Sequence, residues 1–177
     1  AVVSDGKVYF AASIWPFMGT FIYALDAETG KTIWQNNGTG AQYIKQPHNS
    51  PSFAGVGPQG ALVVSGDKLL VPGGRSIPAV FNRNTGEFLH YRFSEFNKTG
   101  GSFVCANDSI YINHHRDRNT SFYQINDGQR LEYKLEKYPV ITDDEFIMSG
   151  DSIVVRNSKN LKDKLSVIQV DASKDLI

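Results

Sequence analysis

The sequence is short of cysteine and of net charge, and it has no long apolar run. Its single cysteine, Cys105, cannot form an internal disulfide, and no Cys-x-x-Cys stretch offers the spacing of a zinc, redox or haem site. The 18 Lys and Arg residues balance 18 Asp and Glu residues, so no strong field attracts nucleic acid or an anionic membrane. The sequence contains no run of 18 apolar residues, the length that a helix needs to cross a bilayer. We therefore expect no nucleic-acid partner and no membrane insertion.

The sequence also has no targeting signal and no amphipathic helix of three turns. Ala1–Gly6 contains neither an initiator Met nor a charged segment, and no long apolar stretch follows it. We therefore expect the chain to be a piece of a longer protein. With 41% hydrophobic and 12% aromatic residues, it has enough apolar side chains for an ordered core, which excludes a disordered chain.

Two short motifs recur along the chain. The first is a polar turn followed by an apolar, β-rich run, and its four copies are Asp5–Phe10, Gly66–Val71, Asn107–Ile112 and Gly150–Val155. The second ends a β-rich run with Asp or Asn and in most copies closes with Gly. Its turn residues are Asp26 with Gly30, Asn82 with Gly86, Asn126 with Gly128, and Asp171. Asx side chains accept hydrogen bonds from the backbone ahead and Gly supplies a positive φ, so the second motif predicts a tight turn.

The repeat predicts four short strands in each unit. In the second unit we expect strands at Ala61–Ser65, Lys68–Pro72, Ala79–Asn82 and Phe88–Phe93. A four-stranded antiparallel meander repeated about every 44 residues is typical of a β-propeller blade. We therefore predict an all-β fold, a β-propeller segment with about four blades, in units of roughly 1–59, 60–101, 102–143 and 144–177.

The run Tyr23–Trp34, which reads YALDAETGKTIW, resembles the pyrrolo-quinoline quinone (PQQ) repeat. That repeat occurs in quinoprotein dehydrogenase propellers and in the outer-membrane-assembly lipoprotein. The second unit departs from it, with His90 and Tyr91 where Trp is expected, and the last two units keep only the strand and Asx-turn pattern. The resemblance implies a ring of seven or eight blades, a periplasmic or extracellular location, and the remaining blades of the same propeller as partner. A closed four-bladed ring is the alternative.

Function on such a scaffold is expected in its long loops. Successive connections of an antiparallel meander alternate between the two ends of the sheet, so the long connections share one face, here called the long-loop face. The short turns share the opposite face, the short-turn face. Candidate binding residues on the long-loop face are Trp15, Phe17, His48, Arg75, His114, His115 and Arg116.

Each candidate has a structural alternative. The insertion Gln35–Gly60 is either a lid over the blade edge or a binding loop. Trp15 and Phe17 are either covered by a neighbouring blade or an absent domain, or they form a recognition surface. Arg75 makes either an ion pair within the ring or an anion contact. His114 and His115 are expected in a solvated loop with Arg116, since adjacent residues on an extended strand point in opposite directions and do not share a metal.

The leading functional hypothesis is a noncatalytic propeller scaffold that binds a protein or small ligand on the long-loop face. No catalytic, cofactor-binding or metal-ligating residue is assigned, so enzymatic activity of this segment is not expected. The alternative, implied by the resemblance, is part of a PQQ-dependent dehydrogenase whose PQQ and calcium lie largely outside this segment. Trp34 matches the structural Trp of the repeat and is not assigned to the cofactor. A third possibility is a catalytic module elsewhere in a longer chain.

Overall fold

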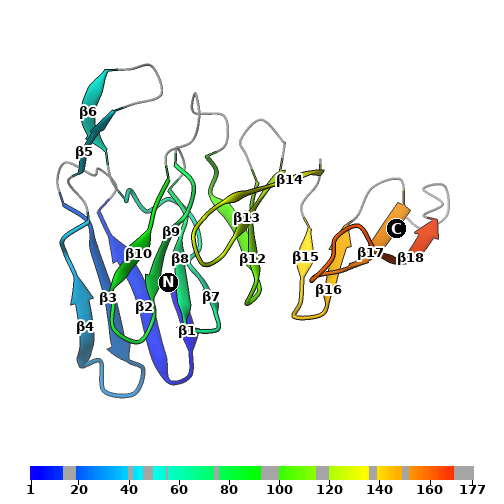
Figure 1. Cartoon of the computed structure of the whole chain (residues 1–177). Coiled ribbons are helices and arrows are strands. Elements are labelled where there is room, and N and C mark those ends of the chain that lie inside the picture. The colour runs from blue at the N-terminus through cyan, green and yellow to red at the C-terminus, as the bar shows by residue number, and fades with distance from the viewer. Residues whose placement is uncertain are drawn as a thin grey trace, which may run out of the picture.

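The computed structural model describes residues 1–13, 19–39, 42–45, 50–54, 56–73, 76–92, 100–114, 120–135, 139–148 and 152–169. These residues form four four-stranded antiparallel sheets and one two-stranded sheet, with no helix among them (Figure 1). The four-stranded sheets follow one another in chain order. They are called blades 1 to 4 below.

Each blade is a meander of consecutive strands. Blade 1 contains β1 (Val2–Ser4), β2 (Lys7–Ala12), β3 (Phe21–Asp26) and β4 (Thr32–Asn36). Blade 2 contains β7 (Val63–Ser65), β8 (Lys68–Val71), β9 (Ala79–Asn82) and β10 (Phe88–His90). Blade 3 contains β11 (Phe103–Ala106), β12 (Ile110–His114), β13 (Thr120–Gln124) and β14 (Arg130–Leu135). Blade 4 contains β15 (Val140–Ile141), β16 (Glu145–Met148), β17 (Ser152–Asn157) and β18 (Lys164–Gln169).

The predicted fold class is confirmed, and the strands expected in the second unit differ from β7–β10 by at most three residues at any end. The fourth blade begins earlier than expected. β15 lies within the stretch 102–143 of the third expected unit, yet it pairs with β16, Val140 opposite Ile147. The first turn of blade 4 therefore lies between β15 and β16, where Thr142 Oγ1 accepts from the Glu145 amide at 2.9 Å.

The turn between the third and fourth strands is tied to the first turn of its blade by an equivalent backbone hydrogen bond in all four blades. The amide after the last residue of the third strand donates to a carbonyl in the blade's first turn. The four pairs are Ala27 to Gly6, Arg83 to Asp67, Ile125 to Ser109 and Ser158 to Asp144. These bonds identify the equivalent residues without reference to sequence. The turn residues are therefore Asp26, Asn82, Gln124 and Asn157.

This equivalence corrects the expected turns of blades 3 and 4. Gln124, and not Asn126, stands in the position of Asp26, since the Gly128 amide donates to Gln124 O as Gly30 does to Asp26 O. In blade 4 the position belongs to Asn157, whose Oδ1 accepts from the amides of Lys159 and Asn160 at 2.8 and 3.3 Å. Asp171 lies outside the described residues.

Neighbouring blades pack through apolar faces. One cluster joins blades 1 and 2, a second joins blades 2 and 3, and a third joins blades 3 and 4. The largest fully buried side chains are Tyr9 and Phe81 in the first cluster, Tyr111 and Tyr123 in the second, and Phe122 and Phe146 in the third. The first strand of each blade contacts the first strand of the next. Burial between faces, and not within a blade, therefore fixes the arrangement.

An aromatic side chain on the fourth strand docks each of the first two blades onto the next turn. Trp34 Nε1 donates to Arg83 O at 2.8 Å, and the ring covers Gly86, where a Cβ would lie 2.5 Å from Trp34 Cε3. His90 repeats this contact, with Nε2 2.8 Å from Ile125 O. The ring of His90 lies over Gly128, whose Cβ would be 3.0 Å from Nδ1. A histidine thus replaces the Trp of the resembled repeat at the second junction.

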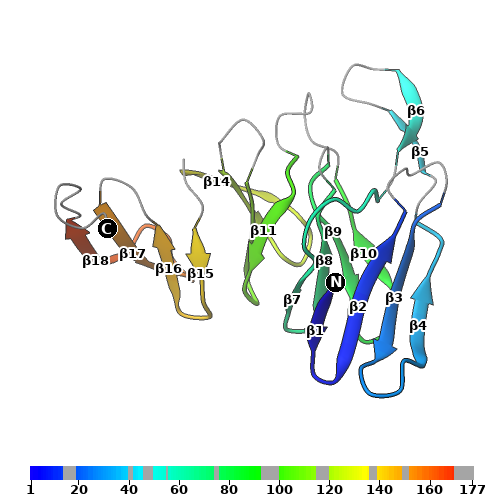
Figure 2. The ribbon, with the colours of Figure 1, turned by 180° about the vertical axis from the view of Figure 1, so that it is seen from behind.

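Blades 1 and 4 lie at opposite ends of the arrangement, and each has one face without a neighbouring blade (Figures 1 and 2). On blade 1, Val3 is 67% exposed and Ile33 44%, with the stacked rings of Phe10 and Tyr23 beside them at a centroid distance of 5.0 Å. On blade 4, the whole of β18 is exposed. No helix in the described residues is long and apolar enough to span a membrane.

Candidate functional site

Most of the predicted binding residues lie outside the described part of the chain. They are Trp15, Phe17, His48, Arg75, His115 and Arg116. Only His114 is described, and its position differs from the expected solvated loop. It is the last residue of β12 and is 6% exposed.

His114 is held in place by neighbouring side chains. Its Nδ1 lies 3.1 Å from Thr120 Oγ1, and its ring meets the ring of Phe103 edge-on at a centroid distance of 6.5 Å. Residues alternate between the two faces of a strand, so His114 shares a face with Ile110 and Ile112, which belong to the core between blades 3 and 4. The expectation of a solvated loop is wrong for His114, because the strand extends one residue further into the core than the polar run suggests.

Part of the insertion Gln35–Gly60 is anchored to the blades, and part of it forms a hairpin above them. Thr20 Oγ1 donates to Val56 O at 2.5 Å, and Val56 is buried in the core between blades 1 and 2. Just before Val56 in the chain, β5 (Gln42–Lys45) and β6 (Pro51–Ala54) pair as a hairpin that stands above the long-loop ends of the blades (Figure 1). Tyr43, on β5, is 62% exposed. The hairpin thus places an amphipathic aromatic side chain on the long-loop face.

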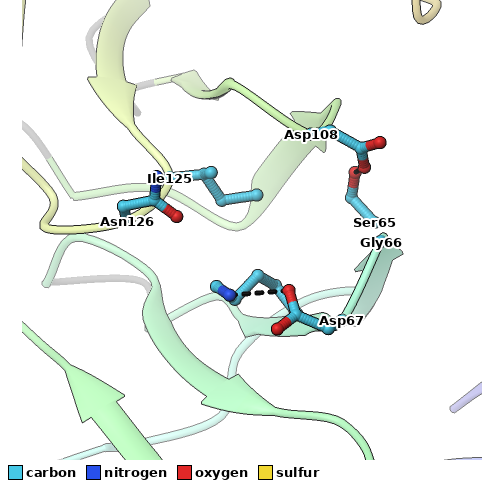
Figure 3. Close-up of a pocket in the computed structure, with 7 residues that line it drawn as sticks. Ser65, Gly66, Asp67, Asp108, Ile125 and Asn126 are labelled. Atoms are coloured by element: carbon cyan, nitrogen blue, oxygen red, sulfur yellow. Dashed lines mark hydrogen bonds and ion pairs between the residues drawn. The ribbon is translucent and has the colours of Figure 1, made fainter.

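A second candidate site lies on the short-turn face. Between blades 2 and 3 the turns enclose an open cavity of about 260 Å³. It is lined by Ser65, Gly66, Asp67, Lys68, Asp108, Ile125 and Asn126. Figure 3 shows Ser65 and Asp108 on one side of it and Ile125 and Asn126 on the other. Three turns from two blades therefore contribute to one polar cavity.

The charged groups of the cavity are arranged in two pairs. Lys68 Nζ lies 2.6 Å from Asp67 Oδ1, and this hydrogen bond holds the pKa of Asp67 below its usual value. Across the cavity, Ser65 Oγ donates to Asp108 Oδ1 at 3.2 Å. In the described residues Asp108 has no ion-pair partner. One carboxylate is thus neutralised by a lysine and the other has only a hydroxyl.

Gly66 permits the close approach of Asp108 to the neighbouring turn. Its φ is +51°, and a Cβ at this position would lie 2.8 Å from Asp108 Oδ1. A larger residue would strain the turn and push the carboxylate away. The geometry of the cavity therefore depends on a glycine in blade 2 that faces an aspartate in blade 3.

The cavity was not predicted from the sequence. The sequence marks Gly66, Asp67 and Asp108 only as turn openings, and Asn126 only as a turn residue. The signature of the cavity appears only when the turns are aligned by their backbone hydrogen bonds, because the residue equivalent to Ile125 in the preceding blade is then Arg83. An exchange of arginine for isoleucine at one repeat position indicates a change in charge and volume at that junction.

The described residues do not fit PQQ with calcium. No three His, Cys, Asp or Glu side chains in the described part of the chain come together as metal ligands. The described tryptophan, Trp34, is 8% exposed, with its ring against Gly86 and its Nε1 bonded to Arg83 O, so its faces are not available for a cofactor to stack on. A quinone site formed by this segment would need residues outside the described ones.

Comparison with known proteins shows the fold and no family. No protein-family model matches the chain, and no curated protein matches its sequence. In structure it is similar to a europium-containing methanol dehydrogenase, with a TM-score of 0.56 and 13% identity over 94% of this chain and 40% of that one. It is similar to the computationally designed Ika8 protein at a TM-score of 0.54 and 12% identity, over 96% of this chain and 44% of that chain.

BamB from Moraxella catarrhalis matches at a TM-score of 0.48 and 16% identity, over 94% of this chain and 51% of that chain. The chain thus spans about half the length, or less, of these three proteins. Identities this low show the fold alone. Together with the four meandering sheets, the likeness to the methanol dehydrogenase and to Ika8, each with a TM-score above 0.5, shows that the chain forms four blades of a β-propeller.

Proposed function

We propose that this chain is a noncatalytic segment of a PQQ-like β-propeller, a rigid scaffold that binds a protein or small ligand on its long-loop face. The remaining blades of a seven- or eight-bladed ring cover the open faces of blades 1 and 4, and the protein works in the periplasm or outside the cell. The compartment follows from the resemblance of Tyr23–Trp34 to the PQQ repeat.

The β5–β6 hairpin is the observation that carries this proposal. It is built on an anchored insertion, because Val56 is 1% exposed and Thr20 is fully buried. A hairpin held at its base and carrying an exposed tyrosine is a common form of binding element, since Tyr presents a large contact area at little cost in side-chain entropy. The rigid blades fix where that side chain stands.

The proposal is tested by site-specific photo-crosslinking in the source organism. A photoreactive phenylalanine analogue replaces Tyr43 in the full-length protein, and the matched control carries it at Glu28, an exposed turn residue on the short-turn face. We expect a discrete crosslinked product from position 43 only. Identical products from both positions, or none from position 43, would contradict a binding role for the hairpin.

The alternative function is a segment of a quinoprotein dehydrogenase, favoured by the structural likeness to a methanol dehydrogenase. The cofactor site would then lie largely in other blades. Calorimetric titration of PQQ with calcium into the full-length protein separates the two functions. Tight binding followed by dye-linked alcohol oxidation supports the dehydrogenase, and absence of binding supports the scaffold.

A further inference from the structure

The cavity between blades 2 and 3 has a counterpart between blades 1 and 2. The Arg83 amide donates to Asp67 O, and the Ile125 amide donates to Ser109 O in the same way. Arg83 and Ile125 therefore occupy equivalent positions at the two junctions. The strand-end serine is also repeated, because Ser4 pairs with Lys7 as Ser65 pairs with Lys68. The two junctions can therefore be compared position by position.

At the first junction a guanidinium fills this position. The Nη1 of Arg83 donates to Ser4 Oγ at 3.1 Å, and its Nη2 forms an ion pair with Asp5. Ser4 Oγ in turn donates to Asp5 Oδ2 at 3.1 Å. The Arg83 side chain is 18% exposed, and its hydrogen bond to Asp5 holds the pKa of that carboxyl below its usual value. A serine hydroxyl and a carboxylate thus form a seat for an arginine side chain.

At the second junction a comparable seat is present without an arginine, although Gly66 stands in the position of Asp5 and the carboxylate comes from the next blade. Ser65 Oγ donates to a carboxylate at 3.2 Å, here that of Asp108 from the next blade. Ile125 brings no charge to the position from which Arg83 reaches. It is 1% exposed, packs in the core between blades 2 and 3 and borders the cavity. Lys68 is already paired with Asp67, so the lining groups Asp67, Lys68 and Asp108 leave one negative charge uncompensated.

From this comparison we infer that the cavity receives the guanidinium of an arginine side chain from a partner protein, with Asp108 and Ser65 as its acceptors. A planar guanidinium offers several N–H donors in a fixed fork, which suits a carboxylate beside a hydroxyl better than a lysine ammonium does. The cavity is open to solvent on the short-turn face, so an arginine on the surface of a partner protein can enter it. This site is separate from the β5–β6 hairpin on the opposite face.

The test uses N-acetyl-argininamide as the probe. It is titrated into the ¹⁵N-labelled full-length protein while backbone amide signals are followed. We expect saturable shifts at Ser65, Asp108 and Asn126 with a millimolar dissociation constant, as suits one partly exposed charge pair. The neutral N-acetyl-citrullinamide should cause none. Equal shifts with citrullinamide or with N-acetyl-lysinamide would overturn recognition of a guanidinium.

Two variants and a control tie the signal to the cavity. Asp108→Asn should weaken probe binding roughly fivefold, and Ile125→Arg should abolish it because the new side chain occupies the seat as Arg83 does. Glu28→Gln, in an exposed turn of blade 1, is the matched control and should bind as the wild type does. Unchanged binding in Asp108→Asn, or in a folded Ile125→Arg, would overturn the inference.

Discussion

Two turn glycines in equivalent positions differ in what a side chain would meet. Gly30 and Gly86 have φ values of +70° and +75°, a region that L-residues adopt only at a cost. A Cβ at Gly30 would have nothing within 4 Å, whereas one at Gly86 would lie 2.5 Å from the ring of Trp34. The same substitution therefore separates backbone strain from loss of docking between blades.

Gly30→Ala should reduce the free energy of unfolding by about 1 kcal/mol through backbone strain alone. Gly86→Ala should reduce it by about 3 kcal/mol, because the Trp34 ring must also move from its place over the turn. Urea denaturation of the two variants measures the difference. Equal losses would show that the contact between Trp34 and Gly86 contributes nothing to stability.

His90 should make the second junction sensitive to acid. Burial lowers its pKa, and this effect outweighs the hydrogen bond to Ile125 O and the charge of Asp127, which raise it. Among the described residues its buried Nδ1 has no hydrogen-bond partner, so a proton there has no acceptor. Because the pKa in the folded state lies below that in the unfolded chain, the stabilisation is complete above the unfolded value near 6.5 and is lost as the pH falls below it.

We therefore expect the free energy of unfolding to fall between pH 7.5 and pH 5 in the wild type. The fall should be smaller in His90→Gln, which keeps a neutral donor at the junction. Denaturation curves at the two pH values test this. A pH dependence that is the same in both proteins would assign the effect to other groups.

At the level of the element, the positions of the strands could be predicted from the sequence better than the strand at which each repeat unit begins. β8 and β9 agree with the predicted strands to within one residue, because clear polar turns bound them. In blade 4 the first turn, Thr142–Glu145, contains no glycine, while Gly150 and Asp151 imitate the opening motif of the other units. The polar turn at Gly150 and Asp151 was therefore matched to the wrong turn of blade 4, which shifted the predicted unit by one strand.

A similar misalignment, of the last turn of blade 3, explains why the cavity was not predicted from the sequence. Aligning Asn126 with Asn82 places Asp127 opposite Arg83, which suggests only a change of charge at an exposed turn. The backbone hydrogen bonds place Gln124 opposite Asn82 and Ile125 opposite Arg83. The exchange of a guanidinium for an apolar side chain becomes visible only when the turns are aligned by structure, because Gln124 lacks the short Asx side chain that identifies the other turns.

The corrected phase of blade 4 can be tested at its last turn. Asn157 Oδ1 accepts two backbone hydrogen bonds, as Asn82 Oδ1 does in blade 2. Asn157→Ala should therefore cost about 1 kcal/mol of stability, and Asn126→Ala should change it by less than about 0.5 kcal/mol. Thermal and urea denaturation give both values. A larger loss in Asn126→Ala than in Asn157→Ala would restore the turn expected from the sequence.

For the molecule as a whole, the two end faces decide how the chain behaves in solution. Its three internal junctions bury apolar faces, and the same kind of face is open on blade 1 and on blade 4. On blade 4 the exposed apolar residues include Leu165, Val167 and Ile168, each at least 47% exposed. Exposed apolar side chains of this kind favour association, and within the described residues β18 also forms an edge of its sheet.

The 177-residue chain should therefore self-associate in proportion to its concentration when the remaining blades are absent. Replacing Val3 and Ile33 by Lys on the open face of blade 1 should shift sedimentation toward the monomer, because a buried lysine would have to lose its hydration. Leu89→Lys, at an exposed apolar residue of blade 2, serves as the control and should leave association unchanged. A monodisperse monomer at every concentration would mean that the end faces are satisfied within one chain, which favours closure of a small ring over completion by further blades.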